Sequence, residues 1–142
     1  MNAANFLTFL RRHRLAVVST VRDGAPQAAV VGIAVTDTLD IIFDTLSTSR
    51  KCANLIADPR VALVIGWDNE QTVQIEGAAD IPRGDELAAC KQAYFAAWPD
   101  GREREKWPDI AYVRVRPRWM RFSDFGTAPP RIEELTLTSG VD

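Results

Sequence analysis

The chain has 142 residues, of which 46% are hydrophobic and 25% are charged, and its net charge is −2. This length suffices for one domain with its own core, and so small a net charge gives no general attraction for nucleic acid or for an anionic membrane. No apolar run approaches the roughly 20 residues that cross a bilayer, and no secretory signal is recognisable. We therefore expect a cytoplasmic protein without a nucleic-acid or membrane partner.

The first third of the chain is expected to form one helix and three strands. Apolar residues at positions 3, 6, 7 and 10 have helical spacing, and the apolar segments that follow are typical of strands. Asp23-Gly24 between two such segments indicates a hairpin, and Gly32 indicates a bulge or a close approach of the backbone. The predicted ranges are a helix over 2–12 and strands over 15–21, 27–36 and 39–44.

The remaining two thirds alternate between helices and strands. Asp58-Pro59 ends a helix, because the residue before a proline is disfavoured in the helical conformation, and Pro117 breaks or bends the last strands. The predicted ranges are helices over 49–57 and 85–98, strands over 61–67, 71–81 and 110–122, and a charged turn over 102–106. Pro129-Pro130 and a Ser/Thr-rich end predict a flexible tail over 127–142.

This set of elements predicts the fold class. Six or seven strands joined mostly by hairpins, with only two interior helices, favour a mainly β (α+β) fold, in which a closed antiparallel barrel carries flanking helices. We see neither an internal repeat nor a linker, so residues 1–126 are expected to form a single domain.

Residues 45–51, Thr-Leu-Ser-Thr-Ser-Arg-Lys, are the most informative stretch for function. They lie where a strand ends and a helix begins, and the first N–H groups of a helix have no internal partners. Arg50 can grip a phosphate through two hydrogen bonds, and Lys51 adds a point charge. The stretch therefore predicts a phosphate site. The plainer alternative is that Thr48 or Ser49 only caps the helix while both cations are solvated.

Metal-dependent and hydrolytic chemistry have little support. Cys52 and Cys90 are far apart and match no ligand spacing, and His13 is the single histidine. We therefore expect no metal site and interpret the cysteines as buried thiols. One histidine leaves a Ser-His-Asp arrangement open, but no G-x-S-x-G motif supports it, so the catalytic residues stay unknown.

Several segments follow one another in a recognisable order: a strand, the Asp-Gly hairpin, two strands, Thr-x-x-x-Ser-Arg-Lys, a helix, Asp-Pro-Arg-Val and a strand. The specific ones are Phe43 to Thr45, Ser49 to Lys51, Asn54-Leu55, Asp58 to Leu63, Val73 to Ala79 and Val113 to Phe122. This order resembles the pyridoxamine 5′-phosphate oxidase-like family, the FMN-binding split barrels, over residues 4–124. Among its members, the small general-stress type is the most similar. The resemblance implies a six- to seven-stranded antiparallel split β-barrel.

The resemblance also implies a site. Arg50 and Lys51 would hold the phosphate of FMN, and Thr45 and Ser49 would donate hydrogen bonds nearby. Members of the family are homodimers whose flavins lie between the subunits, so each site would draw on both chains. Trp98, Trp107 and Trp119 are candidates to line that groove or the dimer contact, although packing is the commoner role of tryptophan.

This chain departs from the family's oxidase at two places. The oxidase carries basic residues on its second strand, whereas residues 28–34 here contain none. Its C-terminal substrate-binding Arg and His have no counterpart in residues 119–125. Oxidation of vitamin B6 is therefore not expected.

By this resemblance, the chain is an FMN-binding flavoprotein. We expect an oxidoreductase that transfers hydride from a nicotinamide donor to a small-molecule acceptor through FMN. Two alternatives stay open: a flavin-binding, stress-related protein without turnover, and a reductase that uses a deazaflavin. Each cofactor carries a phosphate, so residues 45–51 do not separate the three hypotheses.

Overall fold

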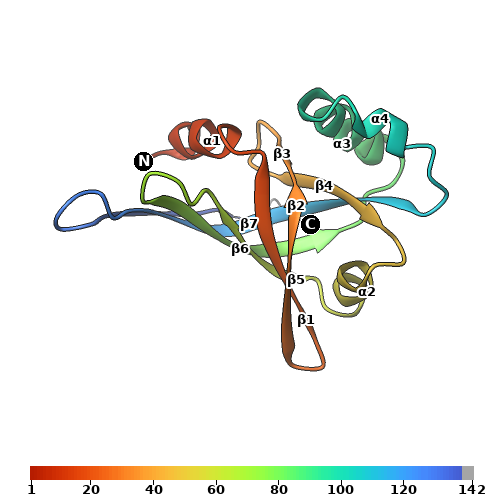
Figure 1. The fold of residues 1–142 in the computed structure, drawn as a ribbon, viewed down its shortest axis with the longest axis horizontal. Helices are drawn as coiled ribbons and strands as arrows, with labels where there is room; N and C mark the ends of the chain where they lie inside the picture. The colour runs from red at the N-terminus through yellow and green to blue at the C-terminus, as the bar shows by residue number, and fades with distance from the viewer. Residues whose placement is uncertain (139–142) are drawn as a thin grey trace.

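The computed structural model describes residues 1–138, which form a curled antiparallel sheet with helices outside it (Figure 1). The strands are β1 (Leu15–Arg22), β2 (Ala25–Gly32), β3 (Ala34–Val35), β4 (Ile41–Leu46), β5 (Arg60–Ile65), β6 (Gln71–Asp80), β7 (Ile110–Asp124) and β8 (Arg131–Thr136). The helices are α1 (Ala3–Arg11), α2 (Arg50–Ala57), α3 (Gly84–Ala97) and α4 (Gly101–Arg104). Neighbouring strands follow the order β2-β1-β5-β6-β7-β4-β3, and β8 pairs with β7. The predicted fold class is confirmed, with one more strand than expected.

The two edge strands of the sheet, β2 and β3, are consecutive in the chain and do not pair with each other. Ile33 alone separates β2, which pairs with β1, from β3, which pairs with β4. The single strand predicted over 27–36 is therefore wrong. The indole of Trp98 lies at this split: its Nε1 donates a 2.9 Å hydrogen bond to the carbonyl of Ile33, and a Cβ on Gly32 would lie 2.7 Å from its ring. The close approach predicted at Gly32 is confirmed.

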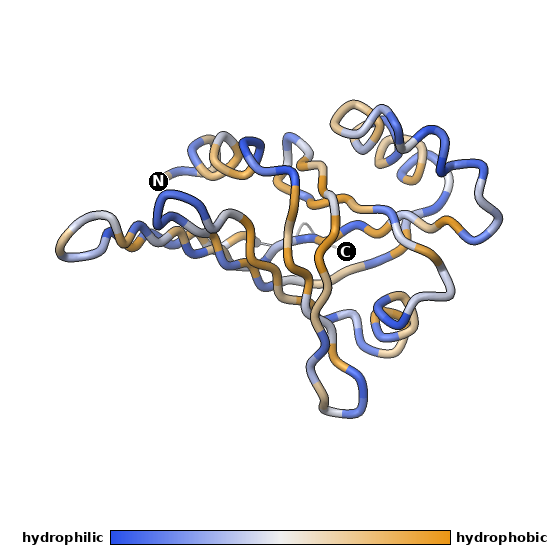
Figure 2. The backbone as a smooth tube through the Cα atoms, viewed as in Figure 1, coloured by the Kyte–Doolittle hydropathy of each residue, from blue (hydrophilic) through white to orange (hydrophobic). Residues whose placement is uncertain are grey.

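The main core lies inside the curled sheet. Buried and exposed residues alternate along the strands, as in β5, where Val61, Leu63 and Ile65 are buried. Hydrophobic residues accordingly predominate along the strands, hydrophilic ones gather in the turns, and the helices carry both kinds (Figure 2). Helix α3 packs on β3, β4 and β7, where Tyr94 and Phe95 belong to a second buried cluster.

The longest strand, β7, bends without breaking. Gly77 of β6 is paired with Pro117, but Glu76 is paired with Trp119, so Arg118 is an extra residue in a bulge. A Cβ on Gly77 would clash with the carbonyl of Arg116, which is why glycine is required at this crossing. The bend predicted at Pro117 therefore occurs within one continuous strand.

The chain does not leave the sheet after residue 126. Residues 131–136, expected within a flexible tail, form β8 along the second half of β7. Leu135 and Leu137 pack against the main core, and the Ser/Thr-rich composition concealed this apolar spacing. The last four residues of the expected tail, 139–142, lie outside the described residues.

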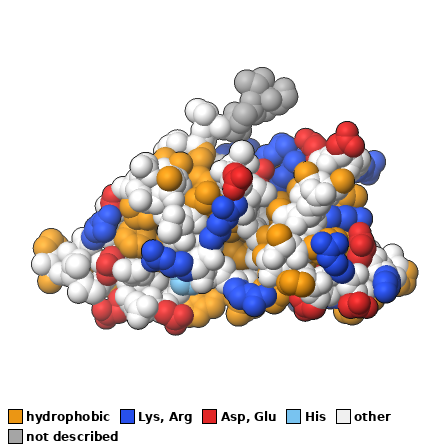
Figure 3. Space-filling view, turned by 90° about the horizontal axis from the view of Figure 1, so that it is seen from above, with side chains coloured by type: hydrophobic (Ala, Val, Ile, Leu, Met, Phe, Trp, Pro, Cys, Tyr) orange, Lys and Arg blue, Asp and Glu red, His pale blue; other side chains and the backbone are white. Residues whose placement is uncertain are grey.

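The three longer helices occur where they were predicted, and residues 101–104, in the region expected as a charged turn, form the short helix α4. Seen from the side that carries α1 and α3, Lys and Arg side chains are dispersed among apolar and acidic ones (Figure 3). None of the helices within residues 1–138 combines the length and hydropathy that a bilayer crossing requires.

Candidate functional site

The four predicted site residues come together where α2 begins. Ser49 is the N-cap of this helix, and its Oγ accepts a hydrogen bond of 3.3 Å from the backbone N–H of Cys52. Thr45, at the end of β4, donates a 3.2 Å hydrogen bond to the same Oγ. The backbone N–H groups of Arg50 and Lys51 lie in the first turn, where a helix has no internal acceptors. The helix dipole adds partial positive charge at this point.

Two cations, Arg50 and Lys51, supply the positive side-chain charge at this helix end. Within residues 1–138, no ion pair joins Arg50 or Lys51 to another side chain. Arg50 is exposed and Lys51 is half-buried. Ser49 thus caps the helix while neither cation is used in an ion pair. This arrangement suits an anion, and a helix cap alone would not require it.

A first hollow of about 320 Å³ separates the start of α2 from the β1–β2 hairpin. We call it the hairpin hollow. Arg50 and Lys51 line one side of it, and Thr20, Gln27, Ala28 and Ala29 line the other. The alanines belong to the stretch without basic residues, so the positive charge in this hollow comes from α2 alone.

A buried amide fixes α2 against the hairpin. Asn54 is 2% exposed, and its Nδ2 donates hydrogen bonds of 2.9 Å to Oγ1 of Thr20 and to Oε1 of Gln27. Both hydrogens of the amide are thereby used. Sequence reasoning gave Asn54 no part in the site. A polar residue between buried Cys52 and Leu55 was the available signal, because a buried amide needs partners elsewhere in the fold.

A second hollow, of about 310 Å³, lies at the same helix end. We call it the Trp107 hollow. It is lined by Asp44, Thr45, Ser49, Lys51, Arg104 and Trp107. The predicted residues are thus divided: Arg50 lines only the hairpin hollow, Thr45 and Ser49 line only the Trp107 hollow, and Lys51 lines both.

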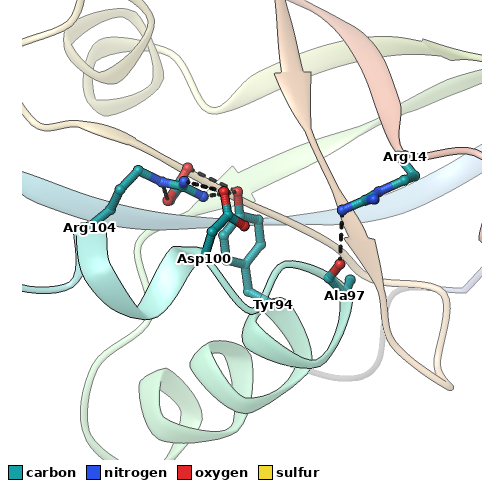
Figure 4. A network of polar contacts seen from close by, with 6 residues as sticks. Arg14, Tyr94, Ala97, Asp100 and Arg104 are labelled. Carbon is teal, nitrogen blue, oxygen red and sulfur yellow. Dashed lines mark hydrogen bonds and ion pairs between the residues drawn. The ribbon is translucent and has the colours of Figure 1, made fainter.

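A polar network supports the strand that leads into this site (Figure 4). Asp44 precedes Thr45 in β4, and its two carboxylate oxygens accept hydrogen bonds of 3.0 Å from the hydroxyl of Tyr94 and 2.7 Å from Nε of Arg104. Arg104 also donates a 3.1 Å hydrogen bond to Asp100. Burial and the neighbouring carboxylate of Asp44 raise the pKa of Tyr94 to about 12. Tyr94 therefore stays a neutral donor across the physiological range.

The other tryptophans lie away from the start of α2. Trp98 packs at the barrel split, where the guanidinium of Arg14 lies 4.0 Å from the centre of its ring. Trp119 lines a separate hollow together with Arg118, and its Nε1 donates a hydrogen bond of 2.6 Å to Glu134 of β8. Of the three tryptophans considered for the groove, only Trp107 therefore adjoins the predicted site residues.

The groups considered for metal or nucleophilic chemistry are dispersed. Within residues 1–138, no three His, Cys, Asp or Glu side chains lie close enough to hold a metal ion. Cys52 and Cys90 are free and buried, as expected, and burial raises the pKa of each thiol. His13 packs against Phe9, with 4.7 Å between the ring centres. Because their pKa values are raised, the thiols of Cys52 and Cys90 are protonated at neutral pH and are poor nucleophiles.

The family model described as "Pyridoxamine 5′-phosphate oxidase" matches residues 3–124. A pyridoxine/pyridoxamine 5′-phosphate oxidase from Bordetella avium is 35% identical over 115 residues, which cover 76% of this chain and 53% of the relative. One from Cupriavidus taiwanensis is 34% identical over 119 residues, covering 77% and 53%. The chain thus spans about half the length of the curated relatives it matches.

Solved structures share the fold at lower sequence identity. A heme binding protein from Mycobacterium smegmatis has a TM-score of 0.81 and 22% identity, with 96% of this chain and 58% of that chain covered. A pyridoxamine 5′-phosphate oxidase-related, FMN binding protein from Nostoc punctiforme has a TM-score of 0.70 and 14% identity, covering 96% and 97%. A FAD-binding protein from Mesorhizobium loti has a TM-score of 0.71 and 14% identity, covering 86% and 92%.

Proposed function

This chain belongs to the pyridoxamine 5′-phosphate oxidase family, and on that premise we propose that it binds a flavin through the phosphate at the start of α2. The observation that carries the proposal is the pair of cations, Arg50 and Lys51, which have no ion-pair partner within residues 1–138 and lie on a capped helix N-terminus beside a hollow. FMN is the proposed flavin, because one phosphate matches one such cradle. The FMN-binding and FAD-binding relatives of the same fold support a flavin of some kind.

The donors at this helix end fit a phosphate. Arg50 offers two parallel N–H groups, Lys51 an ammonium, and the first turn of α2 its free backbone N–H groups. Thr45 can donate its hydroxyl hydrogen to a phosphate in place of Ser49, to which it is bonded at 3.2 Å. On the side of the hairpin hollow opposite Arg50 and Lys51, β2 presents Ala28 and Ala29 and no cation. We therefore propose that this protein holds its flavin less tightly than relatives with a basic second strand.

We propose further that the protein is an oxidoreductase with a nicotinamide donor and a small-molecule acceptor. A bound flavin would supply hydride transfer, which requires no acid or base from the protein. The chain's own residues would bind the phosphate and keep α2 in place. Oxidation of pyridoxamine phosphate is not proposed, because the resemblance finds no counterpart of the oxidase's substrate-binding Arg and His in residues 119–125.

A dimer is part of the proposal. The outer face of the sheet carries a row of valines across three strands: Val17 of β1 is paired with Val30 of β2 and with Val64 of β5. Val30 is 61% exposed and Val64 is 38% exposed. Val30 lies two residues from Ala28, which lines the hairpin hollow. We propose that a second copy covers this row, so that the partner completes the flavin site from the hairpin side.

The deciding experiment is the visible absorption spectrum of the purified protein before and after addition of FMN and desalting. Retention of the flavin band in stoichiometric amount, followed by its loss on addition of a nicotinamide donor without oxygen, would support both parts of the proposal. Retention without reduction would favour the flavin-binding protein without turnover. No retention of FMN, with retention of a deazaflavin in a parallel sample, would overturn the choice of flavin.

A further inference from the structure

We propose that a hollow between α1 and α3 is a second ligand site, which binds an aromatic carboxylate. Its volume is about 760 Å³, within the range of small-ligand pockets. We call it the interhelix hollow. It shares no lining residue with the hairpin hollow or the Trp107 hollow, so this inference does not depend on the proposed flavin site.

Three segments that are distant in the sequence enclose the interhelix hollow. The end of α1 and the residues after it contribute basic side chains, and residues 33–37 contribute the strand β3 and its flanks. Helix α3 contributes the opposite side. Both helices lie on the same side of the sheet, with β3 between them (Figure 1). A ligand in this hollow would therefore contact three elements at once.

The side formed by α3 is apolar although it faces solvent. Four alanines of α3 line the hollow at positions 89, 93, 96 and 97, a spacing that places them on one face of the helix. All are exposed except Ala93, which is half-buried. Buried Ile33 and Val35 add further apolar lining. Small side chains leave a smooth surface, on which a flat ring can lie closely.

The other side of the hollow is basic, but one of its cations is already engaged. Arg11 donates a hydrogen bond of 2.8 Å to Asp37, and its Nε and Nη2 donate to the carbonyl of Val35 at 3.1 and 2.8 Å. Its charge is thus balanced and its side chain is held. The imidazole of His13 lines the hollow, and no hydrogen bond within residues 1–138 uses its nitrogens. It can donate at least one N–H to a ligand.

Arg14 supplies the charge that would hold an anion. Within residues 1–138 it has no acidic partner. Its guanidinium lies on the ring of Trp98, and Nη2 donates a 3.2 Å hydrogen bond to the carbonyl of Ala97 (Figure 4). Its other N–H groups have no protein acceptor in the described part of the chain. A carboxylate matches such a planar donor group through two parallel hydrogen bonds.

The surroundings of Arg14 favour a singly charged ligand over a phosphate. Ala97 is the last residue of α3, and the carbonyls at the end of a helix carry partial negative charge. A phosphate with about two negative charges would meet this end of α3 with a single unpaired guanidinium beside it. A carboxylate requires only that one cation. An aromatic carboxylate therefore fits both the charge and the apolar side of the hollow.

The test is isothermal titration of the wild-type protein with 2-naphthoate, its uncharged amide and the corresponding naphthylmethylamine. We expect a dissociation constant of about 10–100 μM for the carboxylate, about tenfold weaker binding of the amide, and no binding of the amine. Saturation with FMN should leave the affinity for the carboxylate unchanged, because the two sites share no residue.

Two pairs of variants locate the binding. Arg14→Gln should weaken it about tenfold, whereas Arg12→Gln, which removes an exposed cation that does not line the hollow, should not. Ala93→Phe projects a ring into the hollow and should abolish binding, whereas Ala88→Phe adds the same ring on an exposed part of α3 outside it. Thermal unfolding of each variant without ligand verifies that it is folded.

No binding of the carboxylate to the wild type at about 1 mM would overturn the inference, and so would equal affinities for the carboxylate and the amide. Binding that survives Ala93→Phe in a folded protein would exclude this hollow as the site. If FMN displaces the carboxylate, the carboxylate occupies the flavin site and the inference fails. None of these results bears on whether the protein binds FMN, so the proposed function is tested separately.

Discussion

The side-chain nitrogen of Asn54 lies 2.9 Å from the hydroxyl oxygen of Thr20, in a buried contact that joins α2 to β1. The same nitrogen also bonds Gln27 of β2. Together with the packing of buried Leu55 in the main core, these two bonds hold α2, and with it Arg50 and Lys51, against the hairpin. Asn54 thus helps to hold the start of α2, where we propose that a phosphate binds, although it lines neither hollow.

Asn54→Ala should lower both stability and flavin affinity. The substitution leaves Thr20 and Gln27 without their donor, which costs about 1–3 kcal/mol for buried polar groups. Urea unfolding measures the stability, and a flavin titration measures the affinity. Gln74→Ala, on the exposed side of β6, is the control and should change neither. An Asn54→Ala protein as stable as the wild type would contradict the anchoring role.

Arg50→Ala should weaken flavin binding by about 1.5–3 kcal/mol, the scale of a hydrogen bond to a charged group. Stability should change little, since Arg50 is exposed and has no partner in an ion pair within the described residues. Isothermal titration with FMN gives the affinity. Arg12→Ala, an exposed cation at the end of α1, serves as the control. Equal affinities of Arg50→Ala and the wild type would remove Arg50 from the phosphate site.

Ala29→Lys should strengthen flavin binding. Ala29 lines the hairpin hollow opposite Arg50 and Lys51, so a lysine there adds a third cation to the site. We expect about a tenfold gain in affinity, less whatever the added charge loses to repulsion from its neighbours. Ala88→Lys, on the exposed side of α3, adds the same charge away from the site. A gain in both variants would indicate a general effect of charge and not a local contact.

Tyr94 should make stability depend on pH in the alkaline range. Its pKa is raised by burial and by Asp44, from the ordinary value near 10 to about 12. The folded state therefore retains the proton more firmly than the unfolded state, so this stabilisation is complete below about pH 10 and is lost as the pH rises to about 12. Denaturant unfolding at several pH values should show a steeper loss for the wild type than for Tyr94→Phe. Parallel losses in the two proteins would mean that Tyr94 does not titrate in this way.

Val30→Glu should shift the protein from dimer to monomer. Val30 is the most exposed member of the valine row on the sheet, and a carboxylate there would be buried without a partner in the proposed interface. Sedimentation velocity at micromolar concentration distinguishes the two states. Ala88→Glu controls for the added charge. A wild type that already sediments as a monomer would exclude the shared flavin site.

Local patterns predicted much of this fold. The Asp-Gly turn, the alternation of buried residues in β6 and the Ser49 cap each depend on residues within a few positions of one another. The four candidate site residues were identifiable for the same reason, since they lie within residues 45–51. The strand break at Ile33 was not predicted; the carbonyl of Ile33 accepts a hydrogen bond from Trp98, which is 65 positions away and which no local pattern indicates.

The sequence by itself determined the strands, the helix that begins at Arg50 and the cations on that helix end, because turn chemistry, capping and charge are properties of neighbouring residues. Only the tertiary structure decided what faces those cations. Asn54 reaches Thr20 and Gln27 across 34 and 27 positions, and Asp44 reaches Arg104 across 60. The fold of the sheet brings these segments together, and Lys51 lines both of the hollows that result. Such contacts depend on how the whole sheet closes, and no spacing within one segment encodes them.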